Sequence, residues 1–322
     1  MNYLTRRLLL TIPLLLFVTL VTFSMLSLIK GDPAKVILGT SYTEENGAKV
    51  RQDLGLDKPF PVRYVTWLGH TVRGDLGNSY YTGEKVNSAL KRAMPVSIQL
   101  VIMGILLSLV ISIPLGMISA YRAGTRLDRL ISVFSFATLA SPGFIIGILL
   151  IFIVALRLKT GSVYWFPAGG FTPFTENPLQ SIRSLFLPAM TIAIGQIATY
   201  TRILRTDMAS TLQDDYVLMA KAKGLSDKYI LFRHAFRPSS FTLLTVAGVS
   251  LGTLLGNALI VESLFGLNGV GSTIARSVFT KDYPMILGGV AVITFIFVLL
   301  ATIVDLLYAV IDPRVRFARS VA

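Results

Sequence analysis

Long apolar stretches separated by short charged segments dominate the pattern of the chain. Six of them contain no Asp, Glu, Lys or Arg, and each can cross a hydrocarbon core of roughly 30 Å as a helix. They are apolar on every face, a pattern that predicts helices and excludes a β-barrel. The sequence therefore predicts an all-α integral membrane protein with six transmembrane helices, at residues 9–29, 95–119, 130–156, 184–201, 238–261 and 283–304.

The predicted spans divide the chain into three parts. Residues 1–29 hold the N-terminus and first span, residues 30–94 form an extracytoplasmic subdomain, and residues 95–322 form a five-helix core. The core contains a long loop, 202–237, between its third and fourth helices. Pro142 and Gly143 fall inside the span at 130–156 and are expected to bend or loosen it. The apolar stretch after Arg6 and Arg7 is too long for a signal peptide, so we expect a retained first helix.

The 30–94 subdomain is predicted to contain two short helices. Thr43 before Glu44 and Glu45 indicates one helix start, and a second, amphipathic helix is expected around Tyr64 and Trp67. In one interpretation this second helix lies in the outer membrane interface with Tyr64 and Trp67 as anchors. In the other it is a dock for an external partner.

The distribution of basic residues predicts the orientation. Lys and Arg divide 15 to 15 between the two sides, but ten of them lie in the long 30–94 connection, which is nearly exempt from the positive-inside rule. The short segments divide 15 to 5 in favour of cytoplasmic termini. The net charge of +13 is explained by a basic rim facing anionic membrane lipid, so no nucleic-acid partner is expected.

Residues suited to catalysis or ion coupling are scarce. The chain has no Cys and two His, and no carboxylates cluster at span depth, so neither catalytic residues nor a metal site are expected. The span centres hold no ionisable side chain for a proton relay; Glu262 and Asp305 sit near span ends, where water or headgroups are expected to reach them. Polar residues expected to line a hydrated path are Gln99, Gln196, Tyr200, Asn257 and Glu262.

The energy source is expected to lie outside the chain. No G-x-x-x-x-G-K-[ST] phosphate-binding motif is present, so active transport requires a separate ATP-hydrolysing subunit. A secondary transporter or passive channel working alone is the competing class, and a polytopic membrane enzyme is a third. An ATP-driven permease should not transport as an isolated chain, whereas a secondary transporter or channel should transport unaided.

The 202–237 loop is predicted to form two short helices joined at an elbow. Gly224 supplies a left-handed C-cap for the first helix, and Ser226 or Asp227 caps the second, which Pro238 ends or passes to the next span. One interpretation is a plug that docks into a partner; the alternative is an amphipathic helix on the inner leaflet, with Lys221, Lys223 and Lys228 facing phosphates. The expected docking residues are Asp215, Tyr216, Met219, Ala220, Lys221, Ala222, Lys223, Gly224 and Leu225.

This loop resembles the cytoplasmic loop of ABC importer permeases, in the branch that handles dipeptides, oligopeptides, nickel and glutathione. In it, Leu218, Met219 and Ala220 stand where the family motif has Glu-Ala-Ala. The order and spacing of further strings carry the resemblance along nearly the whole chain: Gly31-Asp32-Pro33, Leu54-Gly55-Leu56-Asp57-Lys58-Pro59, Gly74-Asp75-Leu76-Gly77, Val261-Glu262-Ser263-Leu264-Phe265, Gly269-Val270-Gly271, Asp282-Tyr283-Pro284, Asp305-Leu306-Leu307-Tyr308 and Asp312-Pro313-Arg314.

The resemblance implies a type I ABC importer permease in a bacterial or archaeal cytoplasmic membrane. The chain would form the path for di- or oligopeptides with a second, homologous permease, with nickel or glutathione as alternative substrates. Two ABC ATPase subunits would bind ATP and Mg, and an extracytoplasmic solute-binding protein would deliver the substrate. This chain itself would carry no cofactor.

Overall fold

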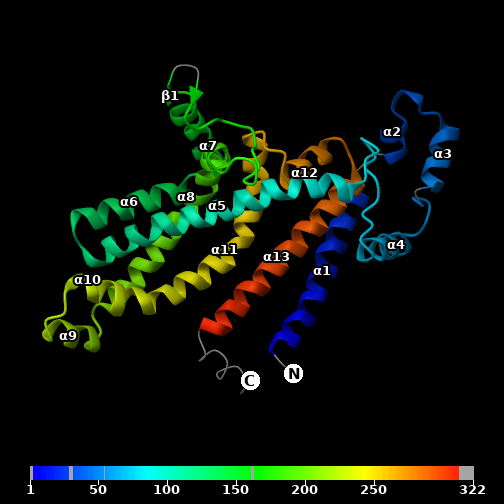
Figure 1. Cartoon of the computed structure of the whole chain (residues 1–322). Coiled ribbons are helices and arrows are strands. Elements are labelled where there is room, and N and C mark those ends of the chain that lie inside the picture. Colours follow the sequence, from blue (N-terminus) through cyan, green and yellow to red (C-terminus); the bar gives the residue numbers. More distant parts are fainter. Residues whose placement is uncertain (1–2, 29–31, 54, 161–162, 312–322) are drawn as a thin grey trace. The chain divides into compact units, whose positions relative to one another are not determined.

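The computed structural model describes residues 3–28, 32–53, 55–160 and 163–311, nearly all of them helical or in short connections (Figure 1). These residues form two compact units. The first contains the residues up to Ser97 together with Asn268–Leu299, and the second contains Ile98–Leu267 and the residues from Leu300 onward. The string at 312–314 that resembles the end of the permease family lies outside the described residues.

The first unit joins the N-terminal helices to two helices from near the end of the chain. Thr43 caps α3 as predicted, because its Oγ1 accepts a hydrogen bond from the backbone N–H of Asn46 at 3.2 Å. The predicted amphipathic helix is α4. The unit's elements are α1 (Tyr3–Leu28), α2 (Pro33–Leu38), the 3-10 turn η1 (Gly39–Ser41), α3 (Glu44–Asp53), α4 (Phe60–Val72), the start of α5 (Val86–Tyr121), α12 (Val270–Phe279) and most of α13 (Tyr283–Ile311).

Tyr64 and Trp67 of α4 pack against α1, through contacts that the sequence did not predict. Their ring centroids lie 5.6 and 5.8 Å from that of Phe23 on α1. The Tyr64 hydroxyl also donates to the carbonyl of Leu16 at 3.1 Å. The sequence showed an amphipathic helix, but which apolar face it would bury depended on the position of α1.

The core of the first unit forms where α5 and α13 approach closely. Gly288 permits this approach, since a Cβ at that position would lie 2.7 Å from Cγ1 of Val86. Residues from the 74–77 and 282–284 strings adjoin this core, so the first unit brings these distant motifs together. The buried members are Leu76, Val86, Leu90, Ala93, Val270, Ile274, Met285 and Ile286.

The second unit is built around α8. This helix packs against α6, α7 and α11, and buried Tyr200, Leu204 and Met208 lie in its core. A short antiparallel hairpin pairs Lys159 with Tyr164. The elements are the rest of α5, α6 (Arg126–Ala140), α7 (Gly143–Leu150), the π-helical turn η2 (Ile151–Ala155), β1 (Lys159–Thr160), β2 (Val163–Tyr164), α8 (Pro178–Thr211), α9 (Asp215–Ala222), α10 (Asp227–Tyr229), the π-helical turn η3 (Ile230–Phe236) and α11 (Arg237–Leu264).

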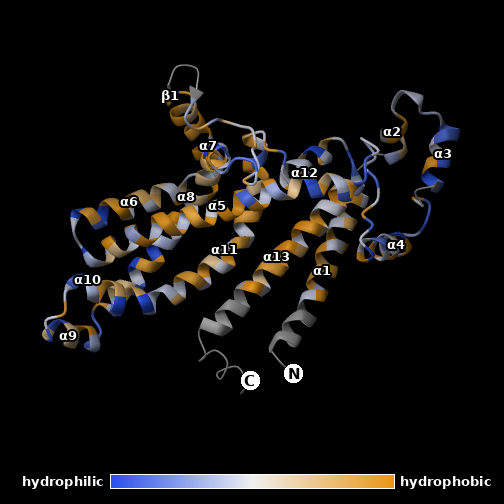
Figure 2. Cartoon of the chain, in the orientation of Figure 1, coloured by the Kyte–Doolittle hydropathy of each residue, from blue (hydrophilic) through white to orange (hydrophobic). Residues whose placement is uncertain are grey.

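Four described helices are long and apolar enough to cross a membrane: Val86–Tyr121, Pro178–Thr211, Asp227–Leu264 and Tyr283–Ile303. The apolar stretch Thr11–Ser27 of α1 is shorter. Long orange segments in Figure 2 mark the apolar helices. Ile102, Leu106 and Val110 form an exposed apolar row on α5, which is unfavourable in water and ordinary against lipid. Helices α5 and α8 begin at Val86 and Pro178, before the predicted runs at 95–119 and 184–201. A helix can continue past its apolar part into the headgroup region.

The 130–156 run is strongly bent, as the Pro142–Gly143 pair predicted. Helices α6 and α7 meet at 106°, as a broken span or a re-entrant loop. Ser141 adopts an extended conformation (φ −95°, ψ 130°) because the ring of Pro142 disfavours a helical residue before it. The expected bend at Pro142 and Gly143 is confirmed. With this pair counted as one span, the described residues contain up to five candidate spans.

Candidate functional site

The first helix of the 202–237 loop ends in a left-handed turn at Gly224. Helix α9 runs from Asp215 to Ala222, and Gly224 has φ +77°. The N–H of Leu225 donates to the carbonyl of Ala220 at 3.3 Å, closing the turn. A Cβ at Gly224 would meet nothing within 4 Å, so glycine is favoured here by backbone conformation alone. The predicted C-cap is confirmed.

The second helix continues into the next span. Ser226 is its N-cap, and the helix runs without a break from Asp227 to Leu264 as α10, η3 and α11. The helix therefore continues through Pro238 and does not end there. Proline has no N–H to donate to the carbonyl of His234, four residues earlier. The Tyr216 hydroxyl donates to that carbonyl at 3.0 Å, which ties α9 to the helix that enters the span.

We call residues 212–236 the α9–α10 elbow. A small core holds it together, formed by buried Val217, Ala220 and Ile230 with partly buried Leu212. Ala220 is 6% exposed, so its methyl group fills this core and does not face a partner. The other expected docking residues are exposed, including Tyr216 (47%) and Met219 (58%) on one side of α9.

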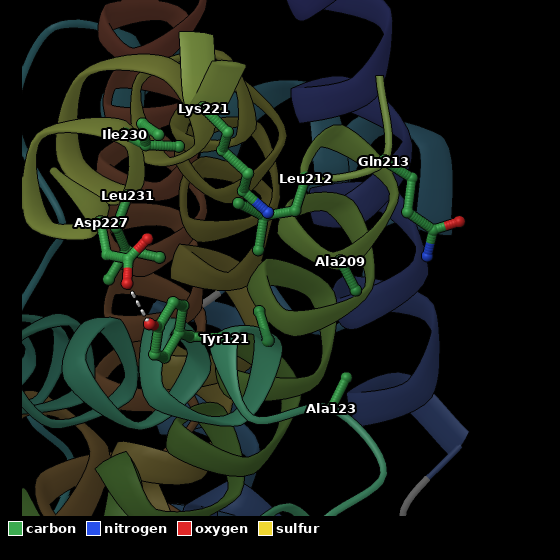
Figure 3. A pocket seen from close by; sticks show the side chains of 10 residues that line it. Tyr121, Ala123, Ala209, Leu212, Gln213, Lys221, Asp227, Ile230 and Leu231 are labelled. Carbon is green, nitrogen blue, oxygen red and sulfur yellow. Dashed lines mark hydrogen bonds between the residues drawn. The ribbon is translucent and has the colours of Figure 1, made fainter. Parts of the chain in front are cut away.

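A cavity of about 250 Å³ lies beside the elbow, between the ends of α5 and α8 (Figure 3). Tyr121 at the end of α5 donates its hydroxyl proton to Oδ2 of Asp227 at 2.7 Å. This bond joins the start of α10 to a second long helix. The cavity is lined by Ala120, Tyr121, Ala123, Ala209, Leu212, Gln213, Lys221, Asp227, Ile230 and Leu231.

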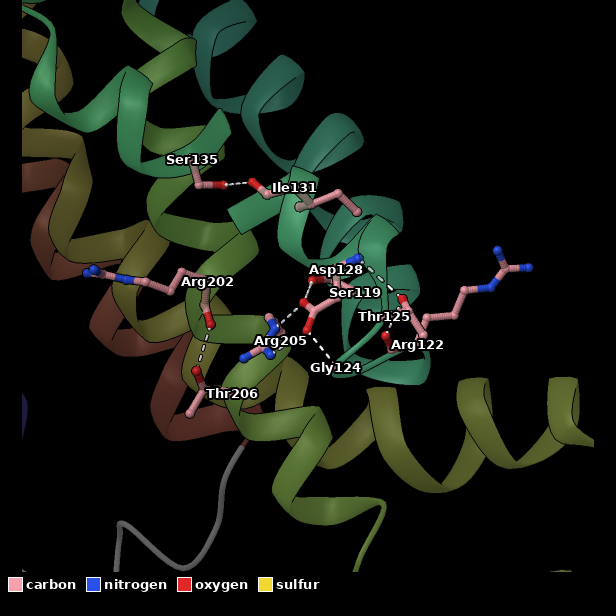
Figure 4. Close-up of polar contacts among 10 residues, drawn as sticks. All are labelled: Ser119, Arg122, Gly124, Thr125, Asp128, Ile131, Ser135, Arg202, Arg205 and Thr206. Atoms are coloured by element: carbon pink, nitrogen blue, oxygen red, sulfur yellow. Dashed lines mark hydrogen bonds and ion pairs between the residues drawn. The ribbon is translucent and has the colours of Figure 1, made fainter. Parts of the chain in front are cut away.

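An ion pair connects three helices of the second unit (Figure 4). Asp128, near the start of α6, accepts two hydrogen bonds from Arg205 on α8, from Nε at 2.6 Å and from an Nη at 2.7 Å. Ser119 on α5 donates to the same carboxylate at 2.5 Å, and the Gly124 N–H donates at 2.9 Å. Sequence reasoning missed this group because both charges lie in segments that looked like ordinary basic and acidic membrane rims.

The residues expected to line a path occupy different environments in the second unit. Gln196 on α8 donates to Oγ1 of Thr253 on α11 at 3.1 Å, and Asn257 on α11 is exposed. Gln99 accepts from the Ser181 hydroxyl at 3.4 Å. Tyr200 is fully buried, so it belongs to the core of the second unit.

Glu262 is also fully buried, which corrects the expectation that water or headgroups reach it. It lies in the last turn of α11, and the chain after it folds back so that the N–H of Leu267 donates to the Glu262 carbonyl at 2.8 Å. Sequence position near a helix end therefore did not imply exposure. The side chain of Asp305 lies outside the described part of the molecule. Within that part, no group of three His, Asp or Glu side chains is arranged to hold a metal ion.

These features define a class: a polytopic helical membrane protein with an exposed elbow continuous with one of its apolar helices. Residues 112–317 match the family described as "Binding-protein-dependent transport system inner membrane component", and residues 1–101 match the family of its N-terminal component. The chain belongs to this family. It is an inner-membrane permease component of a binding-protein-dependent transport system, and its role is transport, not catalysis.

Relatives match along the full length of the chain. One is the "Probable peptide ABC transporter permease protein y4tP" of Sinorhizobium fredii, 34% identical over 315 residues, covering 98% of this chain and 99% of the relative. Another is the "Oligopeptide transport system permease protein AppB" of Bacillus subtilis, 33% identical over 318 residues with 98% and 99% coverage. The resemblance expected from the sequence strings is confirmed.

Proposed function

We propose that the chain is one of two homologous permeases that form the path of an ATP-driven importer for di- or oligopeptides. It has six spans with both termini in the cytoplasm, an outer subdomain at 30–94, and a five-helix core at 95–322 containing the coupling loop. Two ATPase subunits bind ATP and Mg, and an extracytoplasmic solute-binding protein supplies the peptide. The two relatives, a peptide permease and an oligopeptide permease by name, support the peptide substrate.

The observation that carries the coupling role is the helix from Asp227 to Leu264. Its first residues form one arm of the elbow, and its remainder is apolar enough to cross the membrane. A force applied to α9 reaches this helix through the Tyr216–His234 hydrogen bond and the small core that contains Val217 and Ile230. An ATPase that binds the elbow can therefore tilt the Asp227–Leu264 helix as a rigid body.

The energetic demand is within reach of nucleotide-driven closure. Changing two states from 1:99 to 99:1 requires about 5.5 kcal/mol of differential binding. The path that opens would be lined by Gln99, Gln196 and Asn257 together with the second permease. Their neutral polar side chains suit a hydrated passage for peptides. Buried Tyr200 and Glu262 would hold the helices that carry these path-lining residues in place.

The test is to replace Gly224 by Trp in the transporter reconstituted with its partner subunits. This substitution strains the left-handed turn as well as adding bulk, so it should reduce ATPase co-purification and abolish peptide uptake while the chain still inserts in the membrane. Gly83→Trp is a matched control, because Gly83 also has positive φ and open space around its Cβ position. It should leave ATPase co-purification unchanged. Normal uptake by the Gly224→Trp variant, or solute accumulation by the chain alone, would refute the coupling role.

A further inference from the structure

Helix α4 has three different faces around its axis. One face packs on α1 through Phe60, Tyr64 and Trp67, which surround Phe23. At 100° per residue, a narrow polar edge follows with Arg63, Thr66 and His70. The remaining face is an exposed stripe of Val62 (47% exposed), Val65 (65%) and Val72 (79%), which we call the valine stripe.

The contacts of α4 with α1 set its depth relative to the membrane. Phe23 precedes the end of α1 at Leu28 by five residues, or about 7.5 Å at 1.5 Å per residue. The Tyr64 hydroxyl reaches further, to Thr19 Oγ1 at 3.0 Å and to the carbonyl of Leu16 at 3.1 Å. These atoms lie well inside the charge-free run of residues 9–29. If α1 spans the membrane, the body of α4 lies alongside its lipid-immersed part.

We infer that α4 is embedded in the bilayer leaflet crossed by the C-terminal half of α1, with the valine stripe against lipid acyl chains. Amphipathic interfacial helices bury their apolar face roughly 5–10 Å below the headgroups, which agrees with the level of Phe23. The polar edge then faces headgroups and water. The Arg63 guanidinium lies 5.8 Å from the Phe23 ring centroid, and its long stem allows it to extend to the surface from there.

The chemistry of the stripe favours lipid over a protein partner. Its members are small aliphatic side chains, whereas the aromatic residues that dominate energetic contacts in protein interfaces are already used against α1. The ends of the helix are polar: Lys58 precedes it, and exposed His70 in its last turn pairs with Asp75 after it at 3.6 Å. This arrangement holds a helix parallel to a membrane surface, with its apolar side submerged.

The inference rests on the proposed span of α1, and the experiment separates the two. The chain contains no cysteine, so single-cysteine variants can be labelled directly with a fluorophore. The probes are Val65→Cys and Val72→Cys on the stripe, Phe17→Cys on the exposed side of α1 (65% exposed), and Asp57→Cys in the polar linker. Each labelled chain is reconstituted with its partner subunits in phosphatidylcholine vesicles carrying a nitroxide on the acyl chain, or with a water-soluble nitroxide.

We expect the acyl-chain nitroxide to quench Val65→Cys and Val72→Cys about as strongly as Phe17→Cys, and to spare Asp57→Cys. Quenching of both stripe probes by the water-soluble nitroxide instead would overturn the inference and leave the α1 span intact. Quenching by neither nitroxide would also overturn it, because a protein surface would then cover the stripe. Failure of the lipid nitroxide to quench Phe17→Cys would mean that α1 does not span, which contradicts the proposed topology itself.

Discussion

The carboxylate of Asp282 accepts a hydrogen bond from the hydroxyl of Ser79, a residue 203 positions earlier in the chain. The backbone N–H of Tyr80 donates to the other carboxylate oxygen at 2.9 Å, and both Asp282 and Ser79 are 3% exposed. Lys281, just before Asp282, adopts a left-handed conformation (φ +55°). The turn between α12 and α13 is therefore held in an unfavourable backbone conformation that presents Asp282 to the 79–80 loop.

Replacing Asp282 by Ala should destabilise the first unit. The Ser79 hydroxyl and the Tyr80 N–H would lose their acceptor, and each unsatisfied buried group costs about 1–3 kcal/mol. A lower thermal unfolding temperature of the detergent-purified chain would show this. Asp57→Ala, which removes an exposed carboxylate, is the control and should change stability by less than about 0.5 kcal/mol. Equal unfolding temperatures for both variants would contradict the role of Asp282.

Removing the carboxylate of Asp128, which pairs with Arg205 on α8, should destabilise the fold more than removing an exposed charge of α8. Asp128→Ala leaves the partly buried Arg205 guanidinium without its carboxylate. The loss should exceed the roughly 0–1 kcal/mol of an exposed pair and stay below the roughly 3–5 kcal/mol of a fully buried one. Arg205→Lys should also lower stability although it keeps the positive charge, because one ammonium group cannot reproduce two parallel hydrogen bonds. Arg202 is exposed, so Arg202→Ala serves as the control.

The double variant Asp128→Ala/Arg205→Ala gives the sharper comparison. Without either charge, no partly buried guanidinium is left unpaired, so this variant should unfold at a higher temperature than Asp128→Ala alone. The measurement is thermal unfolding in detergent of the parent, Asp128→Ala, Arg205→Ala and the double variant. If the double variant lost as much stability relative to the parent as the two single variants lose together, the two residues would be acting independently.

Features that depend on neighbouring residues could be predicted from the sequence. The apolar helices, the start of α3 and the bend at Pro142 follow from hydrophobic runs, a cap and a proline. The left-handed C-cap at Gly224 follows from glycine's conformational freedom. Each of these is fixed within a few residues, so the sequence carries the whole signal.

Features that depend on tertiary contacts could not be predicted. The Asp128–Arg205 pair joins residues 77 positions apart, and the Asp282–Ser79 bond joins residues 203 apart. The burial of Glu262 depends on how the chain after α11 folds back, which a position near a helix end does not reveal. The packing of Tyr64 on α1 required knowing where α1 lies. In each case the residue type was visible and its partner was not.

Acidification should loosen the packing of α2 on α3. Arg51 donates to Asp32 at 2.6 Å and lowers the pKa of that carboxyl below its ordinary value. Because the folded-state pKa is lowered, the stabilisation is present above the unfolded pKa of about 3.9 and is lost as pH falls through the folded-state value. Hydrogen exchange of residues 33–53, corrected for intrinsic rates, should therefore accelerate below about pH 4. In Asp32→Asn, which keeps an N-cap side chain but no charge, exchange should be faster at neutral pH and lose this dependence.

A graded series at Gly224 should show that its backbone conformation, not its size, supports the elbow. A side chain there meets open space, so the cost comes from the left-handed region, about 1–2 kcal/mol for an ordinary residue and less for Asn. Peptide uptake and ATPase co-purification should decrease in the order Gly, Asn, Ala, Val, because a strained turn favours elbow conformations that no longer fit the ATPase. Gly143 has equally open space without positive φ, so Gly143→Ala should leave both readouts unchanged. If Gly224→Ala transported as well as the parent while Gly224→Val did not, side-chain bulk at the partner surface would be responsible, and the turn itself would not be the element that sets coupling.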